Sequence, residues 1–183
     1  EEDNFKRPAV VVVTGLPRSG TSLLMQMLRA GGMELLIDDH RSLDEHNPRG
    51  YFEYEPAKRI ETDSSWLTLA HGKAVKVVIP LVNTVASGDD PAIIILVHRQ
   101  MDAVMRSQKN MVEASGISVS NVDQARLAEV FEQELHHTVE LVGANPRHQL
   151  AELWYEEILA NPLAAANRLA NVLPACLDAA AMA

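Results

Sequence analysis

The sequence is poor in cysteine, in long apolar runs and in positive charge, and each deficit excludes a class of protein. Cys176 is its one cysteine in 183 residues, so no intrachain disulfide can form; this excludes a disulfide-stapled secreted scaffold and favours a reducing compartment. No apolar stretch approaches the roughly 18 residues that span a bilayer, and the acidic start is unlike a secretory signal. We therefore expect a cytoplasmic protein without membrane insertion.

The charge balance limits the classes of molecule that this protein can bind. There are 16 Lys and Arg against 25 Asp and Glu, for a net charge of −9. Extended polyanions bind through clustered Lys and Arg, so we expect no nucleic-acid partner. A small anion needs only one or two well-placed basic residues and is not excluded. The length and the 47% hydrophobic content predict a single domain over residues 1–183.

The hydrophobic pattern predicts an α/β fold. Continuous apolar runs without alternation are typical of parallel strands covered on both faces, whereas stripes with a period of 3.6 residues indicate helices. Such runs occupy residues 8–13, 74–79, 92–98 and 150–155, and helical stripes occupy 23–28, 101–105, 127–142 and 161–169. Strands that alternate with helices predict a three-layer domain with a central parallel sheet. The alanine-rich end from residue 178 offers little to pack.

A glycine-bounded loop follows the first predicted strand. Gly15 and Gly20 have the spacing of a Walker A loop and precede a predicted helix, where backbone N–H groups and the helix dipole favour an anion. Thr21 stands where Walker A has lysine, and the basic residue lies inside the loop as Arg18. This exchange disfavours a nucleotide kinase, which needs that lysine on the terminal phosphates.

Two motifs carry a resemblance to a known family. The segment 17–24, Pro-Arg-Ser-Gly-Thr-Ser-Leu-Leu, resembles the 5′-phosphosulfate loop of sulfotransferases that use 3′-phosphoadenosine 5′-phosphosulfate (PAPS), in the branches that carry Arg in place of Lys. Arg99 at a strand end, with Ser107 eight residues later, is similar to the 3′-phosphate site of the same family. A softer likeness is the segment 154–162, which is similar to a structural segment after a late strand in many members.

The resemblance implies a P-loop NTPase-like fold and a sulfotransferase that works without a metal. PAPS would be the co-substrate and adenosine 3′,5′-bisphosphate the product. The implied contacts to the 5′-phosphosulfate are Arg18, Ser19, Gly20, Thr21 and Ser22, and those to the 3′-phosphate are Arg99 and Ser107. The basic, glycine-containing loop that many members carry near the C-terminus has no counterpart here, so the resemblance implies either that another segment supplies this contact or that the C-terminus is trimmed.

The general base does not follow from the cytosolic branch of the family. That branch has a Lys-Thr-His-x-Pro strand, and here Lys76 and the proline are kept while Val78 replaces the histidine. Lys76 therefore stays a candidate cation beside the transferred group. Counting forward from the loop onto the base of the tyrosylprotein branch places Asp39 there, with Glu53 and then His40 as rivals.

Two other classes stay open. One is a metal-dependent nucleotide or small-molecule kinase with a degenerate loop, and the other is a non-catalytic nucleotide-binding domain. The acceptor of a sulfotransferase would be a hydroxyl or amine of a small molecule, lipid or carbohydrate, and the sequence does not predict the oligomeric state. His136 and His137 are adjacent on a predicted helix, where they cannot converge on one metal ion.

Overall fold

A computed structural model describes residues 8–38, 50–114, 116, 121–174 and 176–183 of the chain. Four strands form one sheet in which every neighbouring pair is parallel, in the order β2-β1-β3-β4. Their bounds are Val10–Gly15 (β1), Ala74–Lys76 (β2), Ala92–His98 (β3) and His148–Trp154 (β4).

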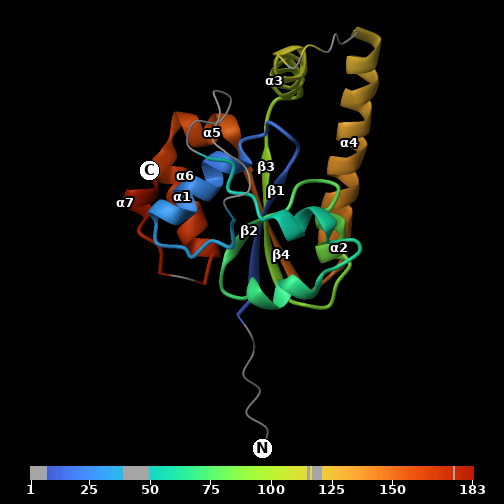
Figure 1. Ribbon diagram of the computed structural model, residues 1–183. Helices are drawn as coiled ribbons and strands as arrows, with labels where there is room; N and C mark the ends of the chain where they lie inside the picture. Colours follow the sequence, from blue (N-terminus) through green and yellow to red (C-terminus); the bar gives the residue numbers. More distant parts are fainter. Residues whose placement is uncertain (1–7, 39–49, 115, 117–120, 175) are drawn as a thin grey trace, which may run out of the picture.

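Helices cover both faces of this sheet (Figure 1). The face on one side carries α1 (Thr21–Ala30), α5 (Tyr155–Ala160), α6 (Pro162–Val172) and α7 (Ala179–Met182), and the other carries α2 (Val82–Ala86) and α4 (Asn121–Ala144). Two short 3-10 helices, η1 (Glu55–Arg59) and η2 (Ser65–Leu69), precede β2, and α3 (Met101–Ala114) follows β3. In the part of the chain that is described, no helix has the length and apolar character needed to cross a membrane.

The pleat of β1 explains why its sequence is a continuous apolar run. Successive side chains point to opposite faces of a strand. Val10 and Val12 accordingly belong to the core on the α2 and α4 side, and Val11 and Val13 to the core on the α1 and α6 side. All four valines are buried because both faces are covered. The predicted three-layer α/β class with a central parallel sheet is thereby confirmed.

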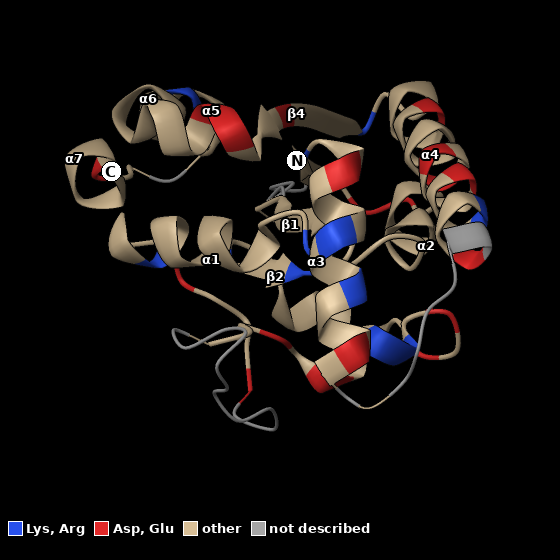
Figure 2. Cartoon of the chain, turned by 90° about the horizontal axis from the view of Figure 1, so that it is seen from above, with Lys and Arg blue, Asp and Glu red and all other residues tan. Residues whose placement is uncertain are grey.

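The carboxyl ends of the strands meet at one edge of the sheet. β1 and β3 run in register to Gly15 opposite Val97, so the loop after β1 and the turn after β3 leave the sheet side by side. Figures 1 and 2 show α3 lying over this edge. Ligands of open parallel sheets bind outside the carboxyl ends of the strands.

Some predicted boundaries shift. The strand predicted over 74–79 is shorter in the structure, because β2 ends at Lys76. The N–H of Val77 still donates to the carbonyl oxygen of Val13 at 3.0 Å. The last predicted helix, over 161–169, is confirmed as α6, and the side chain of Asn161 caps it by accepting from the N–H of Ala164 at 3.1 Å.

The expectation that the C-terminal end has little to pack is wrong. Asp178 caps α7 by accepting from two backbone N–H groups, and Met182 is buried at 3% exposure. A Cβ added at Gly31 would lie 2.5 Å from Cγ of Met182, so the methionine fits against a glycine that directly follows α1. Neither contact has a periodic signal in the sequence, because α7 is a single turn.

Candidate functional site

The loop between β1 and α1 presents the N-terminus of α1 to the carboxyl edge of the sheet. Its backbone turns sharply, with positive φ values at Arg18 (68°) and Gly20 (105°). No side chain of the described residues caps α1, whose first-turn N–H groups also lack intrahelical partners by geometry. The first turn holds no acidic residue that would oppose an anion. This is the donor arrangement that binds phosphate at helix N-termini.

The two glycines of the loop are required by close packing. A Cβ at Gly15 would lie 2.4 Å from Oγ of Ser19 and 2.7 Å from the carbonyl oxygen of Val97. A Cβ at Gly20 would lie 2.4 Å from the ring of Tyr155, the residue that directly follows β4. The loop is therefore held between the ends of β3 and β4, and a side chain at either glycine would displace it.

Arg99 joins the second motif to the loop. Its Nη1 donates to the carbonyl oxygen of Arg18 at 2.7 Å, and its guanidinium carbon lies 4.4 Å from the centre of the Tyr155 ring. Its Nε is buried without a hydrogen-bond partner among the described residues. Arg18 in turn donates from Nε to Oγ of Ser107 at 3.0 Å. The two motifs, far apart in the sequence, thus form one connected structure.

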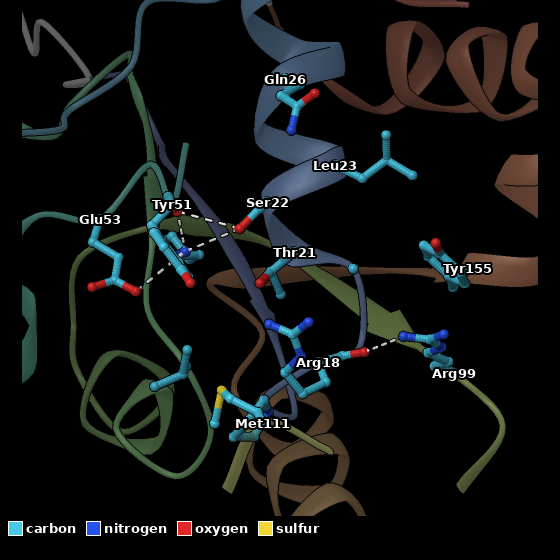
Figure 3. A pocket seen from close by; sticks show the side chains of 14 residues that line it. Arg18, Thr21, Ser22, Leu23, Gln26, Tyr51, Glu53, Arg99, Met111 and Tyr155 are labelled. Carbon is cyan, nitrogen blue, oxygen red and sulfur yellow. Dashed lines mark hydrogen bonds and ion pairs between the residues drawn. The ribbon is translucent and has the colours of Figure 1, made fainter. Parts of the chain in front are cut away.

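These residues border a cavity of about 400 Å³, shown in Figure 3. Arg99 and Tyr155 stand on one side of it, and Glu53 and Tyr51 on the other. Its lining is Pro17, Arg18, Gly20, Thr21, Ser22, Leu23, Gln26, Tyr51, Glu53, Lys76, Val78, Arg99, Met111 and Tyr155. Three of these side chains are cationic and one is a carboxylate, so the lining favours an anion even though the whole chain is acidic.

Lys76 holds together the side of the cavity that Tyr51 and Glu53 form. Its Nζ donates to the carbonyl oxygen of Tyr51 and to Oγ of Ser22 at 3.4 Å, and it lies 3.8 Å from Oε1 of Glu53. The side chain of Lys76 is only 5% exposed. Glu53 also pairs with Lys58, whose Nζ is 3.1 Å from Oε2. The carboxylate therefore sits between two ammonium groups at the edge of the cavity.

The structure brings most of the predicted site residues together. Seven of them line the cavity: Arg18, Gly20, Thr21, Ser22, Glu53, Lys76 and Arg99. Two do not: Ser19 is buried at 1% exposure, with Oγ unpartnered within the described chain, and Ser107 contacts Arg18. Asp39 and His40 lie outside the described residues.

Several lining residues were not assigned to the site from the sequence. Tyr155 belongs to the segment 154–162, for which the resemblance implied a structural role only. Tyr155 says most about how the site is assembled, because its ring contacts both Gly20 of the loop and the guanidinium of Arg99. Its place directly after β4 could have indicated it, since residues at strand ends reach the carboxyl edge. Leu23 lies at the end of the loop motif over 17–24, whereas Gln26, Tyr51 and Met111 do not directly follow a strand.

The described histidines and Cys176 form no second site in the part of the chain that the structure describes. Among the described residues, no group of three His, Cys, Asp or Glu side chains is placed to hold a metal ion. His136 and His137 lie on a helix, α4, as predicted, and both are exposed. Cys176 is exposed near the C-terminus.

Comparisons with known proteins do not assign this chain to a family. No family model and no curated protein matches the chain. Among solved structures, an unliganded sugar kinase from Janibacter sp. HTCC2649 is similar, with a TM-score of 0.40 and 10% identity over 92% of this chain and 99% of that chain. A likeness this weak carries no functional conclusion, so function is inferred below from the cavity and its residues.

Proposed function

We propose that this protein is a sulfotransferase that binds PAPS and transfers its sulfuryl group to a hydroxyl or amine of an acceptor. One observation carries the proposal: Arg18 of the loop motif and Arg99 of the strand-end motif line the same cavity and are joined by a hydrogen bond. Each motif alone fits many anion sites, but a nucleotide phosphorylated at both ends needs the two of them together.

The described residues fit such a ligand. The N-terminus of α1, with Arg18, Thr21 and Ser22, would hold the 5′-phosphosulfate. Arg99 would hold the 3′-phosphate, and its buried Nε lacks an acceptor within the described part of the chain, which a phosphate oxygen would supply. The cavity of about 400 Å³ lies in the size range of small-molecule sites.

The chemistry places defined demands on the protein. In sulfuryl transfer the acceptor oxygen bonds to sulfur while the bond from sulfur to the phosphate oxygen breaks, so negative charge stays on the leaving bisphosphate. Arg18 and Lys76 supply positive charge at the cavity wall to offset it. The hydroxyl proton must pass to a base. Glu53 lines the cavity and is one candidate for this base, and Asp39 and His40 are the other candidates from the sequence.

Comparing two ligands tests the proposal. Adenosine 3′,5′-bisphosphate at about 100 times its dissociation constant should stabilise the protein by about 2.7 kcal/mol in thermal unfolding. ATP with magnesium at the same concentration should stabilise it less. A larger effect of ATP with magnesium would favour the kinase alternative, and bisphosphate binding without transfer to any acceptor would favour the non-catalytic domain. No stabilisation by the bisphosphate would overturn PAPS binding.

A further inference from the structure

A second, smaller cavity adjoins the main one. It has a volume of about 60 Å³, and Glu53, Lys76 and Val78 line both cavities. The rest of its lining comes from η1 and its approach and from the segment around the end of β2: Tyr54, Ala57, Lys58, Val77 and Leu81. We call this cavity the apolar slot, because apart from the charged heads of Glu53, Lys58 and Lys76 its walls are aliphatic and aromatic.

The charged groups at the edge of the slot already compensate one another. Glu53 lies 3.1 Å from Lys58 and 3.8 Å from Lys76, and Lys58 also contacts Glu55 at 2.8 Å. An ionised acceptor group placed here would lose its hydration and would have to compete with these pairs for a counter-charge. A neutral group meets no such cost. The slot is therefore suited to an uncharged, apolar group of the acceptor.

The slot lies on the side of the cavity where the transferred group would meet its acceptor. Arg99 and Tyr155 stand on the opposite side from Glu53 (Figure 3), so a nucleotide held by Arg99 at its 3′ end and by the α1 N-terminus at its 5′ end would leave the Glu53 side open. For an acceptor whose hydroxyl lies beside Glu53, the slot is the neighbouring space into which its carbon chain would extend, since Glu53 and Val78 border both cavities.

We propose that the acceptor is a neutral alcohol with a short apolar group that enters the apolar slot. The inference rests on the proposed sulfotransferase function and narrows its acceptor. A volume of about 60 Å³ takes about two water-sized groups, which corresponds to a branch of two or three carbon atoms. A sugar carries a hydroxyl on nearly every carbon, and the slot offers aliphatic walls in place of partners for them.

A series of straight-chain alcohols tests this. With PAPS as donor, kcat/KM is measured for ethanol, 1-propanol, 1-butanol, 1-hexanol and glucose by following bisphosphate release. Each added methylene that enters the slot should raise kcat/KM about fourfold, the equivalent of about 0.8 kcal/mol per buried methylene. The rise should stop once about three carbons are accommodated, and glucose should be the poorest acceptor.

Two variants locate the effect in the slot. Ala57→Leu fills it and should abolish the dependence on chain length. Leu81→Ala enlarges it and should move the limit to longer alcohols, which keeps the test decisive if the buried Ala57→Leu variant does not fold. Ala125→Leu adds the same side chain at an exposed position of α4 and should leave the series unchanged.

The outcomes separate the two proposals. Suppose first that the bisphosphate stabilises the protein. The acceptor inference is then wrong, and nucleotide binding stands, if kcat/KM does not depend on chain length, if glucose is the best acceptor, if no alcohol is sulfated, or if both slot variants behave as wild type. If the bisphosphate does not bind and no transfer occurs, both proposals fall together.

Discussion

Nη1 of Arg99 donates a hydrogen bond to the main-chain carbonyl oxygen of Arg18, 2.7 Å away. The acceptor belongs to a residue with φ of 68°, a conformation that costs a non-glycine residue free energy. The hydrogen bond thus supports the strained point of the loop from the end of β3. Nε of Arg99 has no hydrogen-bond partner among the described residues, so one guanidinium can both shape the loop and bind an anion.

Arg99→Ala should weaken binding of adenosine 3′,5′-bisphosphate by about 10- to 100-fold, because a hydrogen bond to a charged group contributes roughly 1.5–3 kcal/mol. Calorimetric titration measures this directly. Arg126→Ala removes an exposed arginine from α4 and should bind as wild type. Equal affinities of the Arg99 and Arg126 variants would remove the 3′-phosphate assignment.

The contact between Gly20 and Tyr155 can be separated from backbone strain. Gly20 (φ 105°) and Gly32 (φ 94°) both have positive φ, but an added Cβ meets Tyr155 at 2.4 Å in the first case and nothing within 4 Å in the second. Gly32→Ala should therefore cost about 1–2 kcal/mol of unfolding free energy from conformation alone. Gly20→Ala should cost more, by about 1–3 kcal/mol, as measured by urea denaturation. Similar losses in both variants would show that the ring yields without cost.

What the sequence predicted depended on local signals. The valine run of β1 and the isoleucine run of β3 identified the buried parallel strands, and the glycine spacing identified the loop. Arg99 could be placed because it directly follows a strand, and strand ends of a parallel sheet share one edge.

What the sequence could not predict depends on contacts between distant segments. Tyr155 against Gly20, and the Lys76 ammonium on the carbonyl oxygen of Tyr51, both join segments with no shared periodicity. The second contact explains why Lys76, singled out as a cation for the transferred group, is also the residue that secures the wall carrying Glu53.

Met182 offers a test of the C-terminal packing. Met182→Ala should lower the unfolding free energy by about 2–5 kcal/mol, the range for a buried methionine, because its side chain is 3% exposed against Gly31. Leu159→Ala, at a leucine 57% exposed on α5, should cost less than about 1 kcal/mol. Denaturant unfolding of the two variants compares them. A Met182 variant as stable as wild type would mean that α7 contributes no packing.

His148 should make stability depend on pH. Burial lowers its pKa from the ordinary value of 6.5, against hydrogen bonds to the carbonyl oxygens of Ala86 and Val85 that raise it, and the charge of Arg147 lowers it further. The unfolded chain therefore binds a proton at a higher pH than the folded one. The stability contributed by neutral His148 is complete above pH 6.5 and declines as the pH falls through the window below it.

His148→Gln should flatten this decline. Between pH 7.5 and pH 5, the midpoint temperature of thermal unfolding should fall more steeply for wild type than for His148→Gln. His137→Gln, which changes an exposed histidine of α4, should show the same fall as wild type. Parallel curves for all three proteins would show that His148 does not couple to folding.

The general base is the last part of the site to test, and the two carboxylates give different expectations. Glu53 lines the cavity and is held between Lys58 and Lys76. Glu53→Gln keeps the shape of the side chain but cannot accept the proton, so if Glu53 is the base, kcat should fall about 10²- to 10⁴-fold with bisphosphate affinity nearly unchanged. Asp39→Asn should produce that loss instead if Asp39 holds the role. Glu55→Gln is the matched control, because Glu55 also contacts Lys58 at 2.8 Å but is absent from the cavity lining. A fall in affinity alongside kcat for Glu53→Gln would indicate that the carboxylate positions Lys76 and takes no proton. Wild-type rates in both the Glu53 and the Asp39 variants would exclude a carboxylate base at either position and leave His40 as the remaining candidate.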